Sequence, residues 1–102
     1  MRTSRGGAAP KWDYVGEYKT VSAAYNVTPN DFQIDCTSGT FTVTLPTAVD
    51  RKGRMFSIKN SGTGLITVDP NGSETIDDSA TKMLEQYDNM VIRSDNSNWL
   101  IV

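Results

Sequence analysis

Residues 40–46 read Thr-Phe-Thr-Val-Thr-Leu-Pro, and this stretch decides the fold class. Phe41, Val43 and Leu45 alternate with threonines, so an extended strand would place the apolar side chains on one face and the hydroxyls on the other. Pro46 ends the strand because it has no backbone N–H to donate to a sheet. The stretch therefore predicts a β-strand with one face in a hydrophobic core.

Short alternating segments bounded by turn residues continue on both sides of this strand. They predict further strands at 18–21, 24–27, 32–36, 55–59, 65–69, 73–76, 87–93 and 99–102. The Gly/Ser/Asn-rich segment 60–64 is predicted to be a hairpin connection, and 82–86 a helical turn. No window has a sustained helical repeat of apolar residues. We therefore predict an all-β fold, a small antiparallel β-sandwich or barrel of jelly-roll type.

The composition fits one small domain and excludes several kinds of chemistry. The chain has 102 residues, no His and one Cys, and Thr, Ser, Asn and Gly make up 36 of its residues. Without His there is no Ser-His-Asp or Cys-His catalysis, and a single Cys leaves no intrachain disulfide or four-Cys zinc site. We expect no enzymatic activity, no cofactor and no metal.

Charge divides the chain into two parts. Residues 1–11 carry Arg2, Arg5 and Lys11 and no acidic residue, whereas the remainder holds seven Lys and Arg against twelve Asp and Glu. The first segment has too little apolar surface to fold alone. We predict an extended basic anchoring arm over residues 1–15 and a single β-domain over 16–102.

Membranes and nucleic acids are not expected partners. No apolar run approaches the roughly 20 residues of a spanning helix, and no signal peptide is recognisable at the N-terminus. Three basic residues offer few phosphate contacts, and the rest of the chain is acidic.

Several motifs occur together in a particular order. They are Phe41-Thr-Val-Thr-Leu-Pro46, Gly53-Arg-Met-Phe-Ser-Ile-Lys59, Ile66-Thr-Val-Asp-Pro-Asn-Gly-Ser-Glu-Thr-Ile-Asp77, and Gln86–Asp95 followed by Asn98-Trp-Leu-Ile-Val102. Together they resemble a β-module of tailed-phage virion proteins over about residues 20–102. Asp78 and Asn96 stand where the module usually has glycine. Both residue types tolerate a left-handed backbone, so we expect the two turns to be kept.

The resemblance implies a structural module of fibres, tail appendages or head decorations that is commonly trimeric and has no catalytic residues. Nothing resembling a receptor-binding domain follows Val102, so we expect a head decoration or head fibre that contacts the major capsid protein or another virion protein. The protein would be made in the bacterial host cytoplasm and reside in the virion. The alternatives are a tail-fibre or tail-adaptor module, and a module that binds host-surface glycan.

Three groups of residues are candidates for contacts. Those predicted to dock on the capsid or another partner are Arg2, Arg5, Lys11, Trp12 and Tyr14. Trp12 and Tyr14, together with Tyr18 and Tyr25, have two other interpretations: they stack on sugars, or they cover the base of the domain or a subunit interface. Met90, Ile92, Trp99 and Ile101 are predicted to lie in a homotrimer interface or in the core, because the consecutive apolar residues of these strands need burial on both faces. Arg51, Lys52 and Arg54 form a possible ligand loop, or else a solvated loop.

Acidic residues and the cysteine have plainer interpretations. Glu74, Asp77 and Asp78 do not match a calcium-binding loop, and turn chemistry accounts for them. Cys36 is predicted to be a buried small residue rather than a nucleophile.

Overall fold

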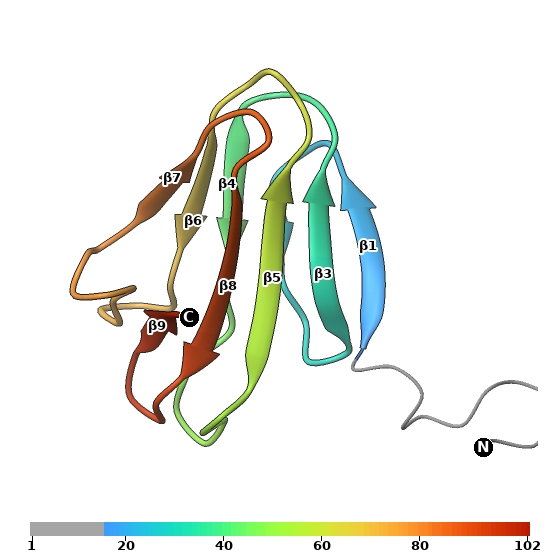
Figure 1. Ribbon diagram of the computed structural model, residues 1–102. Helices are drawn as coiled ribbons and strands as arrows, with labels where there is room; N and C mark the ends of the chain where they lie inside the picture. Colours follow the sequence, from blue (N-terminus) through green and yellow to red (C-terminus); the bar gives the residue numbers. More distant parts are fainter. Residues whose placement is uncertain (1–15) are drawn as a thin grey trace, which may run out of the picture.

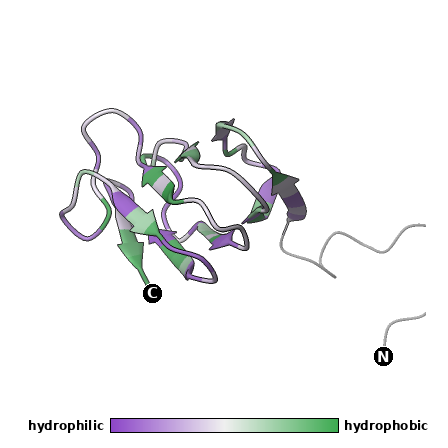
Figure 2. Ribbon diagram, turned by 90° about the horizontal axis from the view of Figure 1, so that it is seen from above, coloured by the Kyte–Doolittle hydropathy of each residue, from purple (hydrophilic) through white to green (hydrophobic). Residues whose placement is uncertain are grey.

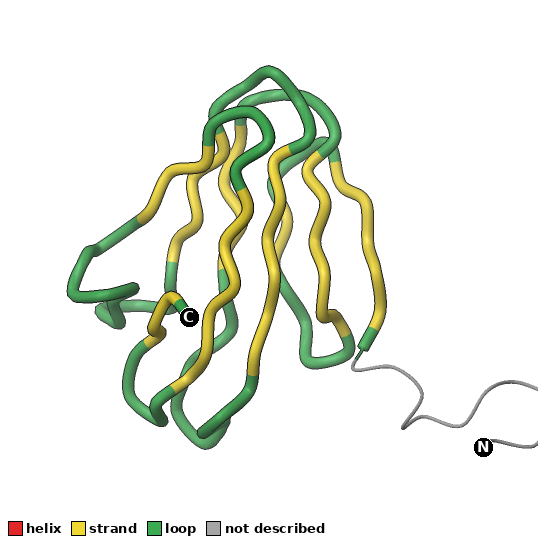
Figure 3. The backbone as a smooth tube through the Cα atoms, viewed as in Figure 1, coloured by secondary structure: helices red, strands yellow, loops and turns green. Residues whose placement is uncertain are grey.

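The computed structural model describes residues 16–102, which form nine strands and no helix (Figures 1 and 3). The prediction of an all-β fold is confirmed. The strands are β1 (Glu17–Val21), β2 (Tyr25–Asn26), β3 (Asp31–Cys36), β4 (Phe41–Thr44), β5 (Met55–Asn60), β6 (Ile66–Asp69), β7 (Lys82–Leu84), β8 (Asn89–Ser94) and β9 (Trp99–Ile101).

The first six strands alternate between two sheets, β7 stays in the sheet of β6, and β8 and β9 both belong to the other sheet. Sheet A has the order β1-β3-β5-β8-β9, and sheet B has the order β2-β4-β6-β7. Sheet A lies in front of sheet B in Figure 1. Each pair β1–β2, β3–β4 and β5–β6 is one coil of the chain, with one strand in each sheet.

The prediction of antiparallel sheets is wrong, because both sheets are mixed. Neighbouring strands of the three coils are parallel in both sheets. Strands β7, β8 and β9 then run antiparallel to their neighbours. The reason is that, up to β6, the chain passes to the other sheet after each strand and returns one coil further along, so corresponding strands of the three coils start at the same end.

Three local predictions also fail. Residues 60–64 are not a hairpin connection, because β5 and β6 belong to different sheets. Lys82–Leu84 is a strand paired with β6 instead of part of a helical turn. The segment 73–76 contributes only isolated bridges from Ile76 to Ser79 and Trp99.

Parallel strands give the molecule two distinct ends. Strands β1, β3 and β5 begin at what we call the proximal end, where the described chain starts at Gly16, and they finish at the distal end. The segments 27–30 and 45–54 therefore lie at the proximal end. The segments 22–24, 37–40 and 61–65 lie at the distal end, about 20 Å away for a six-residue strand.

A single hydrophobic core lies between the two sheets. Its fully buried side chains come from both sheets and include Ile34, Phe56 and Ile58 from sheet A and Val43, Ile66 and Val68 from sheet B. Trp99 closes the core beside Phe56, with ring centres 5.7 Å apart. Seen from the distal end, the strands carry both hydrophobic and hydrophilic residues, and the chain's last residues are hydrophobic (Figure 2).

Asp78 and Asn96 have the backbone expected for them from the sequence. Asp78 has φ of 65° and Asn96 has φ of 82°, both in the left-handed region. The Asn96 side chain also accepts a hydrogen bond from Asp50 N–H at 2.8 Å, which ties this turn to the 45–54 segment.

Candidate functional site

At the proximal end, the buried carboxylate of Asp31 joins the first two coils. Its Oδ2 accepts hydrogen bonds from the Tyr25 hydroxyl at 2.6 Å, from Thr28 N–H at 2.9 Å and from Thr28 Oγ1 at 3.2 Å. Burial, and then the hydrogen bond to Asp31, raises the pKa of Tyr25 to about 12. This hub fixes the turn between β2 and β3.

Arg54 completes the same end of the core. Its guanidinium lies 4.3 Å over the Phe56 ring and donates hydrogen bonds to the carbonyl oxygens of Asp31 and Met55. Burial, followed by the nearby charge of Arg51, lowers the pKa of Arg54. Arg54 therefore has a structural role within the fold.

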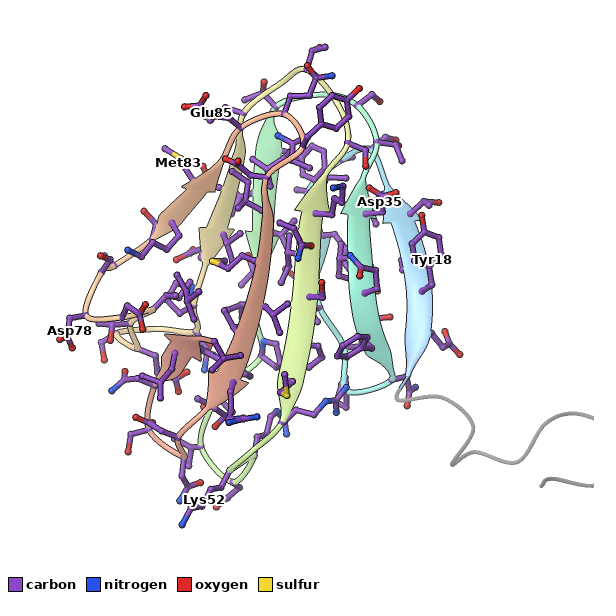
Figure 4. The ribbon with its side chains drawn as sticks, in the orientation of Figure 1. Tyr18, Asp35, Lys52, Asp78, Met83 and Glu85 are labelled. Carbon is purple, nitrogen blue, oxygen red and sulfur yellow. The ribbon has the colours of Figure 1, made fainter. Side chains whose placement is uncertain are left out.

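The predicted ligand loop does not present its three cations together. Lys52 is exposed at the tip of the loop (Figure 4), Arg51 is half-buried, and Arg54 is directed to the Phe56 ring. A ligand at this loop would therefore meet Lys52 first.

A cavity of about 420 Å³ lies beside this loop. Among residues 16–102, it is lined by Phe32, Gly53, Arg54 and Met55. Phe32 is the extra residue of a β-bulge, because Asp31 and Gln33 pair with the adjacent residues Glu17 and Tyr18. Met55 alternates with the buried Phe56, so it lies on the side of β5 that faces away from the core.

At the distal end, tight loops of successive coils stack on one another. A Cβ atom at Gly64 would lie 2.2 Å from the Gly39 carbonyl oxygen, so only glycine allows this approach. Asn60 is fully buried, and its Nδ2 donates to the carbonyl oxygens of Gly64 at 2.7 Å and Leu84 at 2.9 Å. The distal loops are thus held by direct hydrogen bonds and close backbone contacts.

The outer face of sheet A carries a second carboxylate with two partners. Asp35 accepts hydrogen bonds from the Tyr18 hydroxyl, at 2.7 Å, and from Ser61 Oγ (Figure 4). The hydrogen bond to Asp35 is the main reason why the pKa of Tyr18 is raised. These contacts join β1, β3 and the beginning of a distal loop.

The four residues predicted for an oligomer interface or the core are divided between two environments. Met90, Ile92 and Trp99 are buried in the core of this chain. Ile101 is 41% exposed and adjoins two further exposed residues, Leu100 and Val102.

The residues predicted to dock on a partner lie outside the described residues. They are Arg2, Arg5, Lys11, Trp12 and Tyr14.

The acidic residues singled out in the sequence serve turns and loop contacts. Glu74 accepts hydrogen bonds from Thr47 Oγ1 and from Ala48 N–H, and Asp77 Oδ1 accepts one from Ile101 N–H. Asp78 is exposed (Figure 4). Within residues 16–102, no group of three or more His, Cys, Asp or Glu side chains is placed to hold a metal ion.

Cys36 is fully buried, as its sequence pattern predicts. Burial raises the pKa of its thiol to about 11, with the charge of Asp35 as the second cause. A thiol with this pKa is almost entirely protonated at neutral pH and is a poor nucleophile.

Asp31 and Asn60 are buried hydrogen-bonding side chains that the sequence analysis does not single out. The available signal was their position next to strand residues, Asp31 before Phe32-Gln-Ile and Asn60 after Phe56-Ser-Ile-Lys. Polar residues that continue a strand in this way are candidates for buried hydrogen-bond hubs.

Comparisons with protein families, curated proteins and solved structures found no match for this chain. Residues 16–102 contain no helix of the length and hydropathy that a membrane crossing requires.

Proposed function

We propose that this chain is a structural protein of a bacteriophage virion, a head decoration or head-fibre protein that attaches through its N-terminal segment and displays a trimeric β-domain. The proposal is supported mainly by the two distinct ends of the domain. The segment 1–15 joins the domain at the proximal end, and the stacked loops 37–40 and 61–65 lie at the opposite end. Attachment at one end leaves the other end facing outward.

The distal end has the properties of a rigid display surface. Its loops approach too closely to admit a side chain at Gly62 or Gly64, and Asn60 bonds them to the strand β7. A loop held by such contacts loses little further conformational entropy when a partner binds it.

Charge supports attachment through the first residues. Residues 1–11 carry three positive charges, whereas residues 16–102 carry seven Lys and Arg against eleven Asp and Glu. A basic segment next to an acidic domain favours an acidic partner surface, since the domain itself would be repelled by that surface.

Two finer features belong to the same proposal. We class the two sheets around one core as a β-sandwich, in which the three coils supply the parallel strands. We place the contacts of a homotrimer at the exposed apolar residues Leu100, Ile101 and Val102, where a symmetric partner would bury them.

The test replaces Arg2, Arg5 and Lys11 together by glutamine in the intact chain and measures how much protein is incorporated into virions. We expect incorporation to fall at least tenfold. The matched control replaces three cations of the domain, Lys52, Lys59 and Arg93, which removes the same charge from residues 51–93 and should leave incorporation unchanged.

Two outcomes would contradict attachment through the basic segment. The first is equal loss of incorporation in both variants, which would point to a general charge effect. The second is normal incorporation combined with lost adsorption to cells, which would support a module that binds host-surface glycan.

A further inference from the structure

We propose that this chain's own segment Trp12–Val15 binds in the cavity beside β3 and β5. Only residues 1–11 would then extend from the domain to contact a partner. The inference goes beyond the proposed function, because it concerns how the segment is joined to the domain and holds for any partner of residues 1–11.

The bulge in β3 places Phe32 at the cavity. Phe32 has no opposite residue in β1, since its neighbours Asp31 and Gln33 pair with Glu17 and Tyr18. The ring is only half-buried and lines the cavity together with Met55. An aromatic ring and a thioether left partly open to solvent form an apolar seat for another aromatic side chain.

Gly16 lies directly against Phe32, at the point where the described chain begins. A Cβ atom built on Gly16 would lie 2.9 Å from Phe32 Cβ and 3.1 Å from the Asp31 carbonyl oxygen, and the residue has φ of +145°. Only glycine fits this approach without strain. The chain therefore passes directly against Phe32 as it joins β1, within contact distance of a residue that lines the cavity.

Trp12 and Tyr14 are close enough to Gly16 to reach the cavity, and their side chains suit its lining. Trp12 is four residues before Gly16, so its Cα can lie no more than about 14 Å from that of Gly16. In an extended chain Trp12 and Tyr14 point to the same side, so both rings can turn toward the cavity. The walls of the cavity suit them, because Phe32 offers edge-to-face contacts and Arg54 offers donors to a phenol oxygen.

The volume of the cavity favours Trp12 and Tyr14 over the smaller residues of the same segment as its occupants. The cavity of about 420 Å³ is larger than one small side chain needs, and residues 6–11 before Trp12 are Gly-Gly-Ala-Ala-Pro-Lys, which contain no aromatic ring. The aromatic pair is the part of the segment whose bulk matches the cavity.

The test records the Met55 methyl resonance by NMR in the full chain, with methionine methyl groups labelled and Met55 identified through Met55→Leu. We expect a ring-current shift of Met55 that is lost in Trp12→Ala and Tyr14→Ala. Met83 is the internal control, because it is 56% exposed on β7 and should not move. Lys11→Ala is the matched variant and should leave both resonances in place.

A second arm distinguishes a seat in the same chain from exchange between chains. Labelled Trp12→Ala protein is mixed with an excess of unlabelled unchanged protein. Recovery of the Met55 shift in the mixture would show that the segment of a second copy fills the cavity and would overturn the proposal. A Met55 resonance that is the same in all variants would overturn it as well, and would leave the cavity to another ligand.

Discussion

Lys19 lies on the core-facing side of the edge strand β1, with its Nζ 5.9 Å from the centre of the Tyr25 ring. Its parallel partner in β3 is Ile34, which is fully buried, so the two side chains share a face. Lys82 occupies the equivalent position on the edge strand β7, opposite the buried Val68. Inward-pointing charges on edge strands discourage the addition of further strands.

Replacing Lys19 by valine should therefore promote association through the β1 edge. The variant removes the charge and keeps a residue that favours strands. We expect the average mass measured by light scattering to rise with protein concentration, beyond that of the unchanged protein. Lys52→Val, at an exposed loop tip, is the control. Equal masses for the two variants would contradict the protective role of Lys19.

Asp31→Ala should destabilise the domain by about 3 kcal/mol, because it leaves the Tyr25 hydroxyl and Thr28 N–H without their buried acceptor. Tyr25→Phe removes a single hydrogen bond of the same hub and should cost about 1 kcal/mol. Urea unfolding compares the two variants. A smaller loss for Asp31→Ala than for Tyr25→Phe would show that the hub is not centred on the carboxylate.

Gly64→Ala should cost about 3 kcal/mol or more, since its Cβ would collide with backbone atoms of Gly39 that cannot move independently. Gly72→Ala is the control. Gly72 has φ of +56° but open space around it, so only backbone strain of about 1 kcal/mol is expected. Thermal unfolding distinguishes the two costs, and equal midpoints would refute the stacking of the distal loops.

Alkaline pH should weaken the fold through Tyr25 and Cys36. The folded state raises the pKa of Tyr25 from 10.0 to about 12 and that of Cys36 from 9.0 to about 11. A raised pKa means that the folded state holds the proton more tightly than the unfolded state does. This contribution is complete below about pH 9 and is lost as the pH rises toward 12.

The measurement is the free energy of unfolding across this alkaline range. We expect a decline that becomes shallower in Tyr25→Phe and in Cys36→Ala. A decline of unchanged steepness in both variants would assign the alkaline sensitivity to other groups.

The sequence was sufficient to predict most of the strands, but not β7 and not the arrangement of the strands in sheets. Alternation in Phe41-Thr-Val-Thr-Leu marks a strand with one buried face, and β4 follows it. Turn residues at 60–64 mark where a strand ends, yet they do not say which sheet the next strand joins. Local propensity does not predict which sheet a strand joins, because the contacts that decide it are between residues distant in sequence.

The repeat of coils was hidden by unequal spacing. Partners in register are Lys19, Ile34 and Ile58, separated by 15 and then 24 residues. An irregular loop such as 45–54 masks a period that a sequence search would need. Two of the positive-φ positions, Asp78 and Asn96, were easier to predict, since Asp and Asn tolerate a left-handed backbone.

The contact sites were the least predictable part. Arg51, Lys52 and Arg54 are adjacent in sequence, but stacking on Phe56 withdraws Arg54 from any shared ligand site. The cavity is lined by the bulge residue Phe32, and that bulge follows from the pairing of β1 with β3 rather than from the residues of β3 alone.

The proposed function requires this chain to be a component of the virion. Mass spectrometry of gradient-purified phage particles, taken from the phage or lysogen that encodes the sequence, tests it most directly. Trypsin should release the peptide 60–82, which lies between Lys59 and Lys82. We predict that this peptide is present in the particles in fixed proportion to the major capsid protein. Its absence from the particles, with the protein present in the infected-cell lysate, would contradict the account.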